Sequence, residues 1–283
     1  MKGDVYVNSP ESIQALAGVT CVDQLFVTNA TLTSLEGLEG LTKVTNLTIG
    51  WTPPLSFDPL GNPMLQSLKG LEGLRDVGNI HIEGNPVLTD LGALAGLTSN
   101  NGELRIEDNA TLASLEGLHN LTKTGDVILS RLDALANLQG LRGLTEVGSL
   151  VMELCPLVTN FEGLENVVFL GAWISQISSN AALVDFTGLS SLRSIGNEFT
   201  VSNNMALTSF AGLETLERLA WTLHVRDNPE LTTIAALSAL TEIRSDVTIE
   251  DNPKLPQCEV TTLLTGLGKT CTCSGNDDLS SCP

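Results

Sequence analysis

A repeat of 23 to 25 residues runs through most of this chain, and no other feature constrains its fold as strongly. Two early copies open at Ile13 and Leu35, and the step from Leu35 to Leu68 contains an insertion at residues 51–62. The later copies open at Leu68, Leu91, Leu115, Leu138, Phe161, Phe186, Phe210, Ile234 and Cys258. A period this regular indicates stacked turns of a solenoid, because one repeat alone cannot bury its apolar side.

The apolar spacing within each repeat predicts its local structure. Apolar residues recur at every third position from Leu68 to Val77, and Ile80 and Ile82 then alternate with polar residues. Threefold spacing is typical of tight turns, whereas alternation indicates a short strand. We therefore expect a right-handed, leucine-rich-repeat-like β-solenoid of about eleven coils with one short parallel strand per coil. Stacking at about 4.8 Å makes this a rod on the order of 50 Å long.

Two polar or small residues recur in register and are expected to be structural. An asparagine follows the strand, and its amide can satisfy backbone groups of its own turn and of the next coil. A glycine in the "GL" dipeptide is expected to adopt an unusual φ in a turn. The asparagines are Asn85, Asn109, Asn180, Asn204, Asn228 and Asn252. The glycines are Gly37, Gly70, Gly117, Gly140, Gly163, Gly188 and Gly212.

Charge and composition narrow the class of partner. The formal net charge of −19 disfavours nucleic acid and anionic membranes. No apolar run is long enough to span a bilayer, so we expect contact with a membrane only through an anchor outside this sequence. The start lacks the apolar stretch of a signal peptide, so the protein is either cytosolic or trimmed. The cysteines favour the second option, and we expect a trimmed extracellular or cell-surface protein.

The cysteines predict a stapled C-terminal cap. Four of the six are Cys258, Cys271, Cys273 and Cys282, and a short amphipathic helix is expected near residues 260–267. We therefore divide the chain into a solenoid at 1–257 and a disulfide-stapled cap at 258–283. Cys271 and Cys273 are expected to be too close to pair with each other, which leaves 258–271 with 273–282, or 258–273 with 271–282. The spacing lacks the CxxC pairs of structural zinc.

The two remaining cysteines have different environments. Cys155 stands at an asparagine position of the repeat, so a buried, inert thiol is expected. Cys21 is at a position that points outward in other coils, and we expect its partner in a segment upstream of Met1.

The motif V-x-x-I-x-I-x-x-N-P-x-L-T-x-L at 77–91 resembles the leucine-rich-repeat core. With the segment LEGLHNLT at 115–122, the chain is similar to the irregular repeats of receptor L domains. Its ending CTCSGNDDLSSC resembles those of secreted or surface bacterial proteins, myxobacterial ones especially. The resemblance implies an extracellular binding module, but the family shares a scaffold and not a ligand.

Two surfaces are candidates for binding. The first is an exposed apolar patch in which Ile128, Val151 and Ile174 lie side by side, flanked by Arg105, Arg131 and Glu153. A covering loop or a register slip is the alternative. The second is the insertion at 51–62, which carries Trp51 and Phe57. The alternative is that these rings fold back onto the rod.

No catalytic constellation is evident in the sequence. His81, His119 and His224 lie in distant coils without a partner at a fixed spacing, and the SGNDD segment lacks a known calcium motif. We expect no cofactor, no metal and no enzymatic activity. The expected function is recognition of a protein or glycan at the cell surface. The alternatives are a structural spacer and, third, a polysaccharide-active enzyme, for which Glu83, Arg105 and Glu107 are the nearest approach to a carboxylate cluster.

Overall fold

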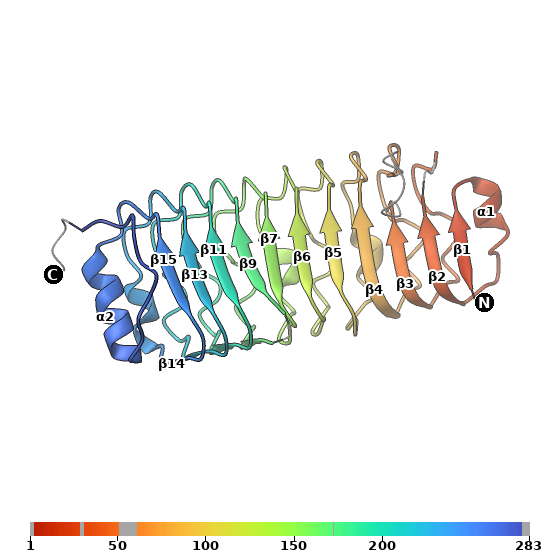
Figure 1. Ribbon diagram of the computed structural model, residues 1–283. Helices are drawn as coiled ribbons and strands as arrows, with labels where there is room; N and C mark the ends of the chain where they lie inside the picture. The colour runs from red at the N-terminus through yellow and green to blue at the C-terminus, as the bar shows by residue number, and fades with distance from the viewer. Residues whose placement is uncertain (1–2, 29–30, 51–60, 172, 279–283) are drawn as a thin grey trace.

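The computed structural model is an elongated parallel β-solenoid of about ten turns (Figure 1). It describes residues 3–28, 31–50, 61–171 and 173–278. The solenoid prediction is therefore confirmed. The inserted segment 51–60, with Trp51 and Phe57, and also Cys282 lie outside the described residues.

Eleven strands, one per turn, form the main sheet along one side of the rod. All neighbouring strands are parallel and pair in chain order. The strands are β1 (Asp4–Val7), β2 (Cys21–Val27), β3 (Lys43–Ile49), β4 (Asp76–Glu83), β5 (Leu104–Glu107), β6 (Val127–Ser130), β7 (Leu150–Glu153), β9 (Ser175–Ser178), β11 (Phe199–Ser202), β13 (Leu223–Arg226) and β15 (Val247–Glu250).

A second sheet of four short strands runs along one edge of the rod in the C-terminal half. Its order is β14 (Glu242–Ile243), β12 (Arg218–Leu219), β10 (Ser194–Ile195) and β8 (Phe169–Leu170). In the first turns the equivalent residues are joined to the main strand, since Cys21, Lys43 and Asp76 begin β2, β3 and β4 in register. The residues at this edge of the rod therefore belong to the main strands in the first turns. In the later turns they form the separate second sheet, and a bend in the chain lies between the two sheets.

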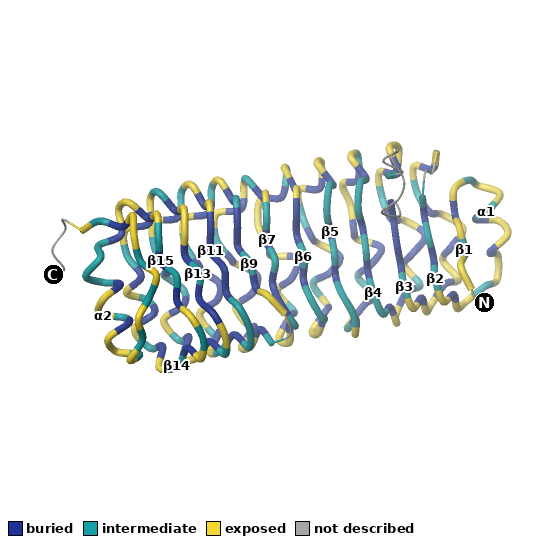
Figure 2. Tube along the Cα trace, viewed as in Figure 1, coloured by how far each residue is buried: buried dark blue, intermediate teal, exposed yellow. Residues whose placement is uncertain are grey.

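The core consists of thin layers of aliphatic side chains, one layer per turn. Leu68, Leu71, Leu74, Ile80 and Ile82 are fully buried, as the threefold and alternating spacings predict. Figure 2 shows buried residues on the strands and exposed residues at the turns. Three turns contain short 3₁₀ segments, each of which buries a leucine: η1 (Gly92–Leu94), η2 (Gln139–Leu141) and η3 (Ala235–Ala239).

The asparagine ladder is confirmed and is longer than predicted. Each ladder asparagine is fully buried, and the Oδ1 atom of Asn204 accepts hydrogen bonds from the backbone N and Nδ2 of Asn180. Asn62 and Asn276 extend the ladder at its two ends. Cys155 takes the ladder position in its own turn, where its backbone N donates to Asn180 Oδ1. Burial raises the pKa of its thiol to about 12, which agrees with an inert role.

The glycine prediction holds for six of the seven positions. Gly37, Gly70, Gly117, Gly163, Gly188 and Gly212 have φ between +103° and +114°. Gly140 is the exception, because it lies in η2 without a positive φ. A Cβ atom there would still lie 2.1 Å from the carbonyl carbon of Leu115, so close approach of the neighbouring turn explains this glycine.

A helix covers each end of the rod. Near the first turn, α1 (Pro10–Gln14) begins with a capping box between Ser9 and Ser12. Across the last turn, α2 (Gln257–Leu267) buries Val260 and Leu264. This is the predicted amphipathic helix, and it begins three residues earlier than expected. Covering the open end removes apolar surface that a terminal coil would expose.

The predicted pairing of the C-terminal cysteines is wrong. Cys271 and Cys273 form a disulfide with each other, and Cys258 is also disulfide-bonded. The Cα atoms of Cys271 and Cys273 lie 5.4 Å apart, within the usual range for a disulfide. Separation by only two residues therefore does not prevent pairing in this backbone conformation.

Candidate ligand-binding face

The solvent side of the main sheet presents one row of side chains across the strands. His81 on β4 pairs in register with Arg105 on β5, and Arg105 pairs with Ile128 on β6. Ile128 then pairs with Val151 on β7. Both apolar residues are half-buried rather than fully covered. The register confirms that Arg105, Ile128 and Val151 are neighbours.

The position predicted for Ile174 is wrong. The residue paired with Val151 is Gln176, and Ile174 lies before β9 in the corner that leads to the sheet. The turn from Phe161 to Phe186 contains 25 residues, and the extra residue displaces Ile174 from the row. The apolar patch on the sheet face therefore consists of Ile128 and Val151.

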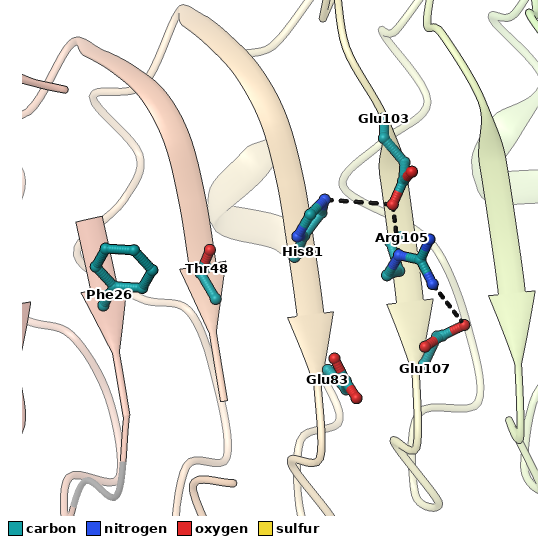
Figure 3. A pocket seen from close by; sticks show the side chains of 7 residues that line it. All are labelled: Phe26, Thr48, His81, Glu83, Glu103, Arg105 and Glu107. Carbon is teal, nitrogen blue, oxygen red and sulfur yellow. Dashed lines mark hydrogen bonds and ion pairs between the residues drawn. The ribbon is translucent and has the colours of Figure 1, made fainter. Parts of the chain in front are cut away.

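Beside this pair lies a cluster of charged side chains around Arg105 (Figure 3). Glu103, just before β5, forms an ion pair with Arg105, and its Oε1 lies 3.3 Å from His81 Nε2. Arg105 also donates from Nη1 to Glu107 Oε1 at 3.2 Å. These contacts hold the guanidinium of Arg105 between two carboxylates.

Arg131 extends the charged cluster around Arg105. It follows β6 and has a positive φ of 52°, in the left-handed region. Its guanidinium donates two hydrogen bonds to the carboxylate of Asp108, at 2.5 and 2.6 Å. Glu107 lies 3.8 Å away and links this pair to Arg105. Such bidentate pairs have fixed geometry, so the face is ordered before any ligand arrives.

The cluster borders an open depression of about 450 Å³ on the sheet. Figure 3 shows the lining side chains, which come from β2 to β5 and the residue that precedes β5. Phe26 lies at one end, and its ring stacks on Tyr6 with centroids 5.1 Å apart. The lining residues are Phe26, Thr48, His81, Glu83, Glu103, Arg105 and Glu107.

Two carboxylates in this depression have opposite pKa shifts. The close contact of His81 lowers the pKa of Glu103 to about 2, with Arg105 acting in the same direction and burial opposing both. Burial raises the pKa of Glu83, with a further contribution from the negative charges of Glu107 and Asp108. Within the described residues, the carboxylate of Glu83 makes no hydrogen bond or ion pair. Glu83 is therefore a half-buried carboxylate without a direct cationic partner.

The lowered pKa of Glu103 predicts a pH-dependent contribution to stability. Because the folded-state pKa is below the unfolded value, this contribution is present above about pH 4.5 and is lost as the pH falls toward 2. We expect Glu103→Gln to lower the free energy of unfolding at pH 7 by on the order of 2 kcal/mol. The difference from wild type should disappear near pH 2 in urea denaturation series.

Glu146→Gln is a matched control for this measurement. Glu146 forms an exposed ion pair with Lys123, and such surface pairs contribute about 0.5 kcal/mol or less. A Glu103→Gln variant as stable as wild type at pH 7 would contradict the proposed contribution.

Sequence reasoning missed Glu103, His81 and Phe26 as site residues. One available signal was an acidic residue two positions before an outward strand residue, as in Glu103 and Arg105. The same spacing occurs at Glu198 and Thr200, where the Thr200 hydroxyl donates to the Glu198 carboxylate at 2.9 Å. Of the other predicted residues, Glu153 lies half-buried on β7, in register with Ser130 and Ser178.

Among the described residues, no group of His, Cys, Asp and Glu side chains is arranged to hold a metal ion. No helix within residues 3–28, 31–50, 61–171 and 173–278 is long and apolar enough to cross a membrane.

Comparison with known proteins adds no assignment. The sequence matches no protein-family model and no curated protein.

Proposed function

We propose that this chain is an extracellular or cell-surface recognition module that binds a partner protein through the main sheet, over β2 to β7. The resemblance of its repeats to receptor L domains supports this class of function. The disulfides of the C-terminal cap support an oxidising compartment. The ligand chemistry follows from the charge cluster.

The observation that carries the proposal is the unpaired carboxylate of Glu83 in the depression. Four carboxylates, those of Glu83, Glu103, Glu107 and Asp108, surround only two arginines. The arginines are bound by the last three of these. A lysine or arginine side chain of a partner would neutralise Glu83 and regain the interaction that burial has cost this group.

Neighbouring residues favour such a ligand. The exposed face of an aromatic ring attracts cations, and Phe26 lines the same depression as Glu83. On the other side, Ile128 and Val151 offer an apolar contact two and three strands away from His81. At about 4.8 Å per strand, Val151 is about 14 Å from His81 along the row. An extended segment with a basic residue followed by an apolar one fits this spacing.

Selection from a displayed random-peptide library against the folded chain tests this proposal. We expect selected peptides to be enriched in lysine or arginine near an apolar residue. Glu83→Gln should weaken their binding about tenfold, as should Ile128→Asp combined with Val151→Asp. Binding is measured by fluorescence anisotropy.

Glu250→Gln is the matched control, because Glu250 on β15 is the register equivalent of Glu83 on β4 and lies at the far end of the sheet. This variant should bind the peptides as wild type does. Selected peptides without basic residues, or equal affinity for Glu83→Gln, would contradict the proposal.

A structural spacer is the second candidate. The specific observation that favours it is the nearly continuous asparagine ladder in a rod with a helix at each end. Such a rod holds two attached partners at a fixed distance without binding a ligand on its side. If the selection yields no specific peptide, the result favours the structural spacer over the recognition module.

A further inference from the structure

We propose a second binding site, independent of the sheet face, at the corner between the two sheets around Phe169. Its ligand is a neutral glycan that stacks on aromatic rings. The site lies on Phe169 of β8 and on Gly171 and Trp173, which come before β9. It shares no residue with the depression around Glu83.

Phe169 differs in chemistry from the residues at the equivalent position of neighbouring turns. The register-equivalent residues of neighbouring turns are charged or polar, and the charged ones form ion pairs along the rod edge. The equivalent residues are Lys123, Glu146, Ser194, Arg218 and Glu242. At this position the chain instead presents a phenyl ring that is 48% exposed. A large apolar side chain on an otherwise charged edge points to a contact surface.

A groove of about 370 Å³ adjoins this ring. Its floor is backbone, because Gly148 and Gly171 line the groove and belong to a run of stacked glycines that continues to Gly125 and Gly196. A Cβ atom at Gly171 would lie 2.1 Å from the Cε1 atom of Phe169, so the ring lies directly on the glycine backbone. Val147, Thr124 and Thr145 complete the wall. The result is a flat apolar surface with polar groups at its margin.

Two exposed tryptophans lie at the same corner between the sheets, outside the residues that line the groove. Trp173 and Trp221 each stand two residues before a main strand, and both strands pair with β11 between them. They are 70% and 56% exposed. Two turns of about 4.8 Å separate their backbones by about 10 Å. This separation is comparable to the disaccharide repeat of an extended polysaccharide.

The charges around the site favour a neutral ligand. Lys123 pairs with Glu146 at 2.8 Å, and Arg244 pairs with Glu242 at 2.7 Å. Arg218 also lies 3.9 Å from Glu242. Since these charges compensate one another, neither an anionic nor a cationic ligand is specifically attracted. The paired side chains still offer donors and acceptors to sugar hydroxyls.

The size of the groove favours a small ligand over a protein. Its volume is within the range of small-molecule sites, whereas a stable protein interface needs about 800 Å² from each partner. The apolar C–H face of a pyranose ring packs on an aromatic ring. The hydroxyls at its edge require the polar margin that the groove provides.

The test is titration of the whole chain with a panel of neutral oligosaccharides, followed by isothermal calorimetry and tryptophan fluorescence. We expect at least one glycan class to bind. Phe169→Ser combined with Trp173→Asn should weaken that binding at least about tenfold. Both replacements copy residues of the next turn, Ser194 and Asn197, so the fold tolerates them. Equal thermal unfolding midpoints would verify this.

Two control variants test whether the loss of glycan binding is specific to the corner site. Met205→Ala alters an exposed apolar residue away from the corner and should leave glycan binding unchanged. Glu83→Gln should also leave it unchanged, because that residue belongs to the sheet face. No binding by the wild type, or equal binding by the Phe169/Trp173 variant, would overturn the proposal. Dimerisation abolished by the same variant would assign the corner to protein contact instead.

Discussion

Replacing Phe186 with alanine is expected to lower the free energy of unfolding by about 4 kcal/mol, the largest effect that we predict for one substitution. Phe186 is fully buried between the rings of Phe161 and Phe210, with centroid distances of 5.3 and 5.0 Å. Phe199 contacts it edge-on at 6.0 Å. The aromatic stack therefore spans three consecutive turns.

The loss is expected to be large because the neighbouring layers cannot collapse into the cavity. Backbone hydrogen bonds between turns fix the distance between layers, as between Phe186 N and Ala211 O at 2.8 Å. Removing the ring leaves a void and removes contacts with both adjacent layers. In a solenoid, stability depends on these nearest-neighbour interfaces.

Urea denaturation followed by circular dichroism measures this effect. Phe169→Ala is the matched control, because it removes the same atoms from an exposed ring and should cost less than about 1 kcal/mol. A loss below about 1.5 kcal/mol for Phe186→Ala would contradict the packing argument.

The second large effect is expected at Asn204, where alanine should cost about 3 kcal/mol. Asn204 is fully buried, and its Nδ2 donates to Ile177 O at 3.0 Å. Its Oδ1 accepts from the backbone N and Nδ2 of Asn180, and its own Nδ2 also donates to Asn228. Alanine would leave several buried polar groups without partners in a ladder whose members support one another.

Cysteine at the same position provides a graded test. Cys155 occupies a ladder position naturally, so Asn204→Cys should lose less stability than Asn204→Ala. Asn101→Ala changes an exposed asparagine and should stay within about 0.5 kcal/mol of wild type. Equal stability of wild type and Asn204→Ala in the same denaturation series would show that the ladder is not required.

The repeat predicted the candidate face only in part. Strand alternation placed Arg105, Ile128 and Val151 in one row, because adjacent parallel strands keep their register when successive turns have equal length. Glu103 was missed because it lies just outside β5, where alternation no longer predicts direction. Its contact with His81 joins residues 22 positions apart, and no local pattern encodes this pair.

The errors fall where the repeat is irregular. Ile174 was misplaced in the 25-residue turn from Phe161 to Phe186, where one additional residue is absorbed at the corner between the sheets. The disulfide of Cys271 and Cys273 lies after α2, in the last copy of the repeat, where a helix replaces the usual turn. The backbone conformation there follows from packing against the last turn, which the periodic pattern does not describe. Phe169 and its groove depend on the same irregular corner.

The sequence by itself determined the solenoid, the number of strands in the main sheet, the buried layers and the asparagine ladder. These features recur in every copy of the repeat, so each copy predicts the same local structure. The turns must also stack in one register for their apolar side chains to be buried. Only the tertiary structure decided which side chains meet at the depression and at the Phe169 corner. Such contacts form between non-equivalent residues of neighbouring turns, and their geometry depends on side-chain directions and corner conformations that no repeat specifies.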